Sequence, residues 1–211
     1  MRTREESEKL ELAAKFIYES NLIENITTPF DKIWREWTKN PLTGHVAALS
    51  LATSEAKMSN KLTEKMLCEW QKLIIQEQNS TTTNVEKIIP ECETGYYRRS
   101  GKMFVADKLC VVPAQAVSNC MEQLLEETNY LQRNLAKPEE EIIKKIADFH
   151  FDFLWIHPFV DGNGRTARIM TWYLFSYFDI KPFIFSSNDK HETYYKAFDG
   201  MRDYFLSKSR A

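Results

Sequence analysis

Glycine is scarce in this chain, and paired cysteines are missing. Six of the 211 residues are glycine and seven are proline, so few positions force a turn and long tracts between them carry helical spacing. The four cysteines, at 68, 92, 110 and 120, include no CxxC pair and no zinc-finger spacing. We therefore expect reduced thiols, and neither a disulfide framework nor a zinc finger.

No segment directs the chain to a membrane or an export route. The N-terminal MRTREESEKLELAAKF is charged from its start and lacks the apolar stretch of a signal peptide. No run approaches the roughly 18–20 apolar residues of a membrane span. A net charge of −2 and a pI near 6.1 lack the basic excess of a nucleic-acid binder. These absences predict a cytoplasmic protein that binds neither membrane nor nucleic acid, with signal-independent secretion left open.

Apolar and aromatic residues are plentiful. They make up 43% of the chain and include 13 Phe, 9 Tyr and 5 Trp, enough to build the core of a single domain over residues 1–211. The periodicity predicts a mainly α fold. The predicted helices span 5–19, 44–59, 62–77, 113–132 and 138–156, with another that resumes at 166. We expect a loop over 78–90 and a short β-hairpin within 95–113.

The stretch HPFVDGNGR, at 157–165, concentrates polar groups and two of the six glycines. Pro158 disfavours helical backbone at the residue before it, so the preceding helix should end near His157. Gly162 and Gly164 permit backbone shapes closed to other residues. The stretch therefore predicts a tight loop between two helices, and free N–H groups at the start of the second helix favour an anion.

The polar residues of this stretch suit a polyphosphate. Backbone N–H groups of residues 162–164 can face phosphate oxygens, and Arg165 can donate two parallel hydrogen bonds to one phosphate. Arg168 lies one helical turn further along. Asp161 is a hard oxygen ligand suited to Mg²⁺, and His157 can accept a proton near neutral pH. Phe159, within the same loop, is expected to point into the core and anchor it.

The segment HPFVDGNGRTAR resembles the signature HPFx(D/E)GNGRxxR of the Fic domain family, and every specified position matches. Residues 95–98 resemble the GxYR that opens the family's flap, 111–129 its following helix, and 191–198 a later segment near the nucleotide base. The resemblance implies a Fic-type helical bundle with a short β-hairpin flap. It places the Fic core at about 90–200.

The family's usual reaction transfers AMP from ATP to a protein hydroxyl. The resemblance makes His157 the base that deprotonates a Ser, Thr or Tyr of an unknown target protein, which can be the enzyme itself, and makes Asp161 the ligand of Mg²⁺. Arg165 would bind the β-phosphate and Arg168 the γ-phosphate. The nucleotide-binding residues that the resemblance implies are Gly162, Asn163, Gly164, Arg165, Thr166, Arg168, Tyr194 and Tyr195.

A homo-oligomer is compatible with the sequence.

The same resemblance implies a hairpin that docks the backbone of the target beside the active site. The expected flap residues are Gly95, Tyr97, Arg98, Phe104 and Val105.

A second, weaker motif lies within the N-terminal region 1–30. The segment Ser20-Asn21-Leu22-Ile23-Glu24-Asn25 fits the family's inhibitory motif (S/T)xxxE(G/N). The resemblance implies that Glu24 pairs with Arg168 in the place of the γ-phosphate, with Ser20 as part of the motif, so removal of this glutamate should release activity. An ordinary helix end is the plain interpretation of the same residues.

Other functions stay open at this point. A Fic enzyme working mainly as a deAMPylase, or using another donor, would share the motif. A non-catalytic nucleotide-sensing module could lose His157 or Arg165, and this sequence has both. A metal-dependent hydrolase built on His157 and Asp161 lacks an HxxxH or HExxH pair. His150 is expected to be a packed, hydrogen-bonded structural residue.

Overall fold

The computed structural model is mainly α, as the periodicity predicts. It describes residues 4–38, 44–100, 104–105, 109–110, 112–134, 137–189 and 205. The α-helices are α1 (Arg4–Ile23), α2 (Phe30–Thr38), α3 (Gly44–Lys57), α4 (Glu64–Thr81), α5 (Val117–Arg133), α6 (Glu139–Ile156) and α7 (Asn163–Tyr177). Single 3₁₀ turns lie at Val85–Lys87, Glu91–Glu93, Ala114–Ala116 and Ser187–Asp189.

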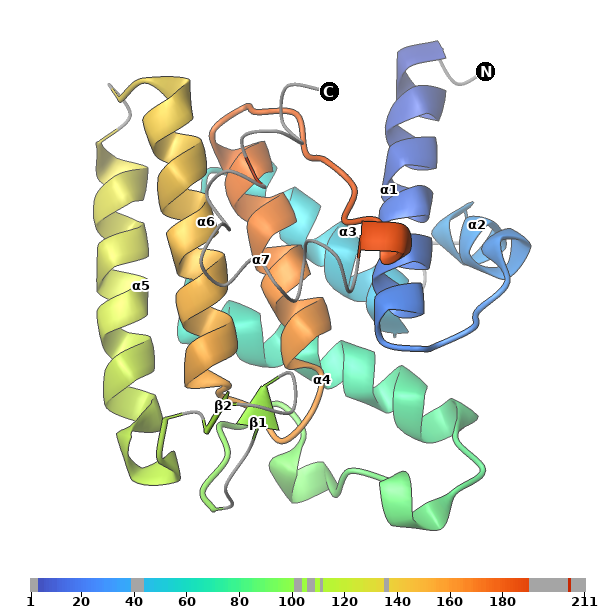
Figure 1. The fold of residues 1–211 in the computed structure, drawn as a ribbon. Coiled ribbons are helices and arrows are strands. Elements are labelled where there is room, and N and C mark those ends of the chain that lie inside the picture. The colour runs from blue at the N-terminus through green and yellow to red at the C-terminus, as the bar shows by residue number, and fades with distance from the viewer. Residues whose placement is uncertain are drawn as a thin grey trace.

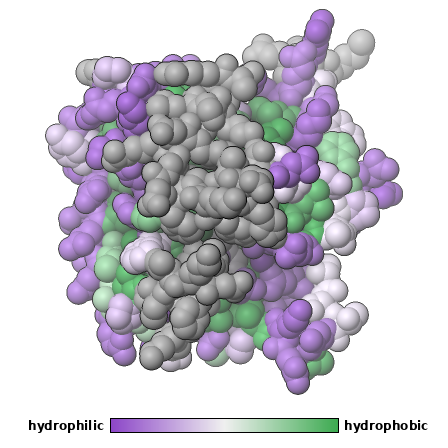
Figure 2. Space-filling model, viewed as in Figure 1, coloured by the Kyte–Doolittle hydropathy of each residue, from purple (hydrophilic) through white to green (hydrophobic). Residues whose placement is uncertain are grey.

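Helix α7 is the centre of the bundle. Every residue from Arg165 to Phe175 is buried, as expected for a helix that is covered on all sides. Helices α3, α4 and α6 pack against it, α5 packs on the far side of α6, and α1 contacts both α3 and α7. In Figure 1, α5, α6 and α7 stand side by side, while α4 crosses below them and α1 lies at the opposite edge from α5. In the same view, hydrophilic side chains cover much of the described outer edge (Figure 2).

Helix α6 shows how the sequence produces these elements. Pro138 precedes its first turn, which carries the three acidic residues 139–141 at the positive end of the helix dipole. The apolar residues of this helix face inward, because Ile146, Phe149 and Phe153 are all buried. The helix ends at Ile156, where His157 turns into the left-handed region with φ of 50°.

His150 joins α6 to α7 as a structural residue, as expected. Its Nδ1 lies 2.8 Å from Thr171 Oγ1, and its ring stacks on Phe185 with 5.3 Å between centroids. Burial lowers the pKa of His150 to about 3. The side chain is therefore neutral near pH 7 and belongs to the packing of the core.

Several predicted helix boundaries were wrong, among them those of α1, α4 and α7. Helix α1 continues past residue 19 to Ile23, because Ser20, Asn21 and Ile23 face the core instead of solvent. Helix α4 continues past 77 to Thr81, so the predicted loop 78–90 starts later. Helix α7 begins at Asn163 instead of residue 166, because a left-handed Gly162 with φ of 80° completes the turn directly before it. All three of these differences change the site, because Ser20, Gln78 and Asn163 lie in the added turns.

Helix α2 was missed in the sequence. Ile33 is buried, and Phe30, Trp34 and Trp37 pack against the core beside it. These positions follow the i, i+3, i+4, i+7 spacing of one helix face. The signal was present but short, at nine residues.

Part of the predicted hairpin is described. Phe104–Val105 pairs antiparallel with Leu109–Cys110, each strand having two residues. The role of this pair as a docking flap stays a prediction, and Tyr194 and Tyr195 lie outside the described residues.

Among the described residues, no helix is long and apolar enough to cross a membrane. The cysteines at 68, 92 and 120 are free thiols.

Candidate functional site

The loop between α6 and α7 is held in shape by Asn163 and Phe159. The Asn163 side chain donates to the Phe159 carbonyl and accepts from the Phe159 N–H, both at 2.9 Å. The Phe159 ring is fully buried, as predicted, with ring centroids 5.5 Å from Tyr97 and 6.3 Å from Phe153. Asn163 thus contributes its side chain to the loop, in addition to the backbone N–H that the sequence suggested.

Helix α7 starts with a set of free backbone donors. Its first helical bond runs from the Thr166 N–H to the Gly162 carbonyl, at 2.9 Å. The N–H groups of residues 163–165 therefore have no acceptor within their own helix. Together with the helix dipole, they make this end of α7 favourable for an anion.

A carboxylate of this chain lies at that end of α7. A Cβ built on Gly164 would overlap Glu24 Oε1, with Arg168 Nη1 at 3.2 Å. A side chain at 164 would therefore displace the Glu24 carboxylate from the first turn of α7. The predicted cradle thus encloses an anionic group supplied by the N-terminal region.

Arg168 holds this carboxylate. Its side chain is fully buried, and Nη2 donates to Glu24 Oε1 at 2.6 Å. The same guanidinium donates through Nε to Ser20 Oγ at 2.8 Å and through Nη2 to the Ser20 carbonyl at 3.1 Å. The structure thus brings Ser20, Glu24 and Arg168 together, although 144 residues separate the last two.

The end of α1 explains the spacing of the N-terminal motif. Asn25 adopts φ of 58°; the Ile26 N–H bonds the Asn21 carbonyl, and the Asn25 N–H bonds the Leu22 carbonyl. This is a Schellman motif, whose left-handed position favours glycine or asparagine. Glu24 is the last position before that turn, one helical turn from Ser20, so both face Arg168. The segment therefore ends α1 in an ordinary way and also contacts α7 through Ser20 and Glu24.

A buried hydrogen bond anchors α1 beside this contact. His45 Nδ1 lies 2.9 Å from Asn21 Oδ1, and the His45 N–H donates to Glu77 Oε2 at 2.9 Å. Burial lowers the pKa of His45 well below its usual value, and Arg165 and Arg168 act in the same direction. No partner for His45 could be named from the sequence, because Asn21 is 24 residues away and belongs to another helix.

His157 is placed as a proton acceptor. Its Nδ1 lies 3.2 Å from the Leu154 carbonyl, which can only accept, so the ring proton resides on Nδ1 and the lone pair on Nε2. Burial lowers the pKa of His157; the Leu154 carbonyl opposes this effect and the Arg98 guanidinium adds to it. The ring is therefore neutral near pH 7.

Arg98 holds the end of α6 and the start of the His157 loop. Its guanidinium is buried and donates to the carbonyls of His157 at 2.7 Å, Ile156 at 3.1 Å and Val112. The Arg98 N–H also bonds the Pro158 carbonyl at 2.8 Å. A cation at the carboxyl end of α6 stabilises the helix dipole there. In this structure Arg98 positions the His157 loop, and its role in target docking stays a prediction.

Two glutamines of α4 were missed by sequence reasoning. Gln71 donates to the Asp161 carbonyl at 3.0 Å and accepts from the Gly95 N–H at 2.6 Å. Gln78 donates to Asp161 Oδ2 at 2.7 Å and accepts from Arg165 Nη2. The residues are seven apart, which places them on one helix face. The only sequence signal for their role was the presence of polar amide side chains in a helix that packs against the core.

The site residues fit a metal-bound polyphosphate. Asp161 is half-buried and accepts from the Gly162 N–H at 2.6 Å through Oδ1, which aims the carboxylate at the helix start. The Nε of Arg165 and the Oγ1 of Thr166 are buried without a hydrogen-bond partner among the described residues. An anion at the start of α7 could use such donors, and Mg²⁺ needs only one or two protein carboxylates when phosphates supply other ligands.

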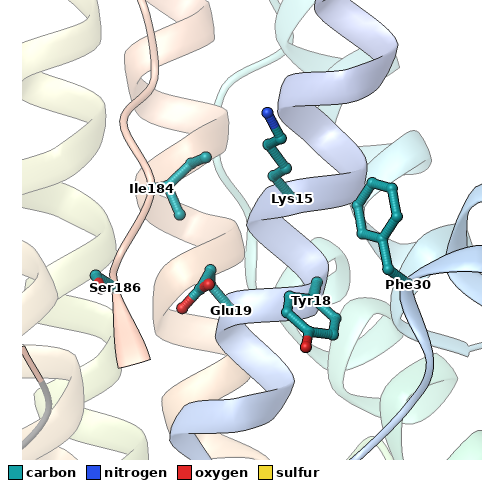
Figure 3. Close-up of a pocket in the computed structure, with 6 residues that line it drawn as sticks. All are labelled: Lys15, Tyr18, Glu19, Phe30, Ile184 and Ser186. Carbon is teal, nitrogen blue, oxygen red and sulfur yellow. The ribbon is translucent and has the colours of Figure 1, made fainter. Parts of the chain in front are cut away.

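A separate cavity of about 400 Å³ lies away from this loop. It opens between α1, the start of α2 and the segment 184–186 (Figure 3). Its lining residues are Lys15, Tyr18, Glu19, Phe30, Ile184 and Ser186. None belongs to the motif, so the cavity is distinct from the predicted nucleotide site.

The contact at Gly164 makes a prediction about stability. Gly164→Ala should fail to gain the roughly 0.5–1 kcal/mol that alanine usually contributes over glycine inside a helix, because the added methyl pushes the Glu24 carboxylate away from Arg168. In a Glu24→Ala background the same change should be more favourable by about 0.5–1 kcal/mol. Urea unfolding of the four proteins in this cycle measures the coupling. Equal effects in both backgrounds would show that Glu24 does not occupy this position in solution.

The comparisons with known proteins agree with this geometry. The model of the Fic/DOC family matches residues 61–175. The chain is 33% identical over 105 residues to Protein adenylyltransferase Fic of Nematostella vectensis, and 34% identical over 74 residues to Probable protein adenylyltransferase aq_aa38 of Aquifex aeolicus. These matches cover 48% and 35% of this chain but only 22% and 21% of the two relatives.

A third relative has a different name. It is the ribonucleoside-diphosphate reductase small chain of Ostreid herpesvirus 1, 34% identical over 76 residues. The match covers 36% of this chain and 13% of the viral protein. Within the described ranges, no cluster of three or more His, Cys, Asp or Glu could hold a metal ion.

Solved structures share the fold. A Fic domain containing signaling protein from Bacteroides thetaiotaomicron aligns over 98% of this chain and 87% of its own, with a TM-score of 0.75 and 17% identity. Fic-1 from C. elegans aligns over the whole of this chain and 63% of its own, with a TM-score of 0.68 and 15% identity. At these identities the likeness concerns the fold alone. Since the family model matches more than half of its residues, the chain belongs to the Fic/DOC family.

Proposed function

We propose that the chain is a protein adenylyltransferase that transfers AMP from Mg-ATP to a Ser, Thr or Tyr hydroxyl of a target protein, and that Glu24 inhibits it. The observation that carries the proposal is the Glu24 carboxylate at the glycine-lined start of α7, bound by Arg168. An acidic group in this place indicates an anion site. The adenylyltransferase names of two relatives support the reaction class.

The transfer needs a base and an anion cradle. The hydroxyl oxygen of the target attacks the α-phosphorus, the bond from that phosphorus to the oxygen bridging the β-phosphate breaks, and pyrophosphate leaves. The hydroxyl proton passes to Nε2 of His157, whose Nδ1–H is held by Leu154. Such transfers depend mainly on positioning and charge stabilisation, which the start of α7 and Arg165 supply.

The metal and the remaining contacts follow from the same arrangement. Asp161 would hold Mg²⁺, whose charge would offset that of the phosphates. Arg165 would bind the β-phosphate. The paired strands Phe104–Val105 and Leu109–Cys110 would guide the backbone of the target. Tyr194 and Tyr195 would lie near the nucleotide base. Arg98 would position the His157 loop beside the docked target.

Inhibition follows from shared use of Arg168. If Arg168 binds the γ-phosphate, Glu24 and that phosphate compete for one guanidinium and for the space beside Gly164. Two negative groups in this space repel each other, so ATP bound with Glu24 in place would take an unproductive pose. The N-terminal region would therefore act as an inhibitory segment, anchored by Asn21 and His45.

Mass spectrometry of the Glu24→Ala protein after incubation with Mg-ATP tests the reaction class. The expected result is a mass increase of one AMP unit on the enzyme itself or on an added lysate protein. The Glu24→Ala, His157→Asn double variant is the matched control and should remain unmodified. An increase of one phosphate unit would indicate a kinase-like transfer, and no increase under any condition would contradict the proposal.

A further inference from the structure

The Gln78 side chain lies between two charged residues of the motif. Its Nε2 donates to Asp161 Oδ2 at 2.7 Å, and its Oε1 accepts from Arg165 Nη2. A carboxylate can only accept and a guanidinium can only donate. The two partners therefore fix the orientation of the amide, and no other orientation satisfies both.

A neutral link at this position has a chemical consequence. Asp161 and Arg165 carry opposite charges and influence each other, because Asp161 opposes the lowering of the Arg165 pKa that burial causes. A direct ion pair between them would occupy the carboxylate and the guanidinium together. The amide of Gln78 instead gives each group a hydrogen bond. Because the amide is neutral, it cancels neither the negative charge of Asp161 nor the positive charge of Arg165.

The rest of the surroundings supports this role. Arg165 is almost fully buried, and its Nε has no partner among the described residues. Its guanidinium is thus held by one amide contact while a donor remains available. Asp161 is fixed from three directions, by the Gly162 N–H on Oδ1, Gln78 on Oδ2 and Gln71 on its backbone carbonyl. Helix α4 supplies two of these contacts.

We propose that Gln78 is a positioning residue, which separates Asp161 from Arg165 and orients the first toward the metal and the second toward the phosphates of the bound nucleotide. The inference rests on the proposed function. Removal of the amide lets the two charged side chains pair with each other. The site then loses affinity for Mg-ATP without any change in the base, His157.

The test uses substitutions on α4 in the Glu24→Ala background. Gln78→Leu keeps the approximate volume of the side chain and removes both polar ends. Gln76→Leu is the matched control, because Gln76 lies on the same helix and is exposed. Contacts around a metal ligand typically change affinity or activity by about 10- to 100-fold. We expect kcat/KM for Mg-ATP to fall by this factor in Gln78→Leu, with a higher Mg²⁺ concentration at half-maximal rate.

Calorimetric titration with Mg-ATP provides a readout besides activity. Gln78→Leu should weaken ATP binding relative to Gln76→Leu, and the loss should be larger with Mg²⁺ than without it. A general loss of structure would instead lower the thermal midpoint and weaken binding equally in both conditions. Equal kinetics and equal binding in the two leucine variants would overturn the proposal.

A third variant covers a failure of Gln78→Leu to fold. Gln78→Glu keeps the shape and the acceptor for Arg165, but places a carboxylate beside Asp161. The new charge should pair with Arg165 and repel Asp161, so ATP binding should fall relative to Gln76→Glu; equal binding would overturn the proposal. If the Glu24→Ala parent transfers no AMP, the proposed reaction fails, while the binding titrations still decide the role of Gln78.

Discussion

Replacing Glu24 with alanine is expected to raise the rate of AMP incorporation by about 10- to 100-fold, the range of typical coupling energies between two sites. The carboxylate lies against Gly164 and pairs with a fully buried Arg168. Its removal frees both the guanidinium and the space beside the start of α7. Incorporation of labelled ATP into the enzyme itself, compared between wild type and Glu24→Ala, measures the effect.

Two controls separate charge from general loosening of α1. Glu24→Gln keeps the size of the side chain and removes its charge, so it should release activity only in part. Glu11→Ala removes an exposed carboxylate of the same helix that pairs with Lys15, and it should behave as wild type. Activation by Glu11→Ala to the same extent would attribute the effect to the helix and not to the contact with Arg168.

Nucleotide binding should change in the same direction. In the Glu24→Ala protein the buried Arg168 has lost its carboxylate partner, so the γ-phosphate of a non-hydrolysable ATP analogue can take that place. Binding to the folded state stabilises it by mass action. The analogue should therefore raise the thermal midpoint of Glu24→Ala more than that of wild type. Equal shifts would mean that Glu24 does not compete for the nucleotide site.

Much of this site could be predicted from the sequence because its groups are local. His157, Asp161, the two glycines and Arg165 lie within nine residues, so loop and helix rules alone place them at one helix start. The apolar stripe of α6 and the buried Phe159 were predictable for the same reason. Spacing over a few residues directly predicts which side chains share a loop or a helix face.

The contacts between distant helices were not predictable from spacing. Gln78 was assigned to a loop, because the polar residues after it gave no sign that α4 continues to Thr81. Asn21 and His45 form a buried pair across two helices, and neither has a sequence neighbour that indicates it. The Glu24–Arg168 pair could be anticipated only through the family resemblance, since 144 residues separate its members.

Replacing His157 with asparagine is expected to lower AMP transfer by about 10²- to 10⁴-fold, the usual contribution of a general base. Asparagine is chosen because residue 157 has φ of 50°, and asparagine tolerates this left-handed backbone better than most residues. The fold and ATP binding should be retained. The rate is measured in the Glu24→Ala background, with circular dichroism and calorimetric titration to verify folding and binding.

The pH dependence distinguishes a base from a positioning group. Only neutral His157 can accept a proton, so activity falls when pH drops below its pKa. Burial lowers the pKa of His157 below 6.5, and kcat/KM should therefore stay level as pH falls through 6.5 and decline only below it. The residual rate of His157→Asn should lack this decline. A decline that starts above pH 6.5, or that persists in His157→Asn, would assign the titration to another group and remove His157 from the role of base.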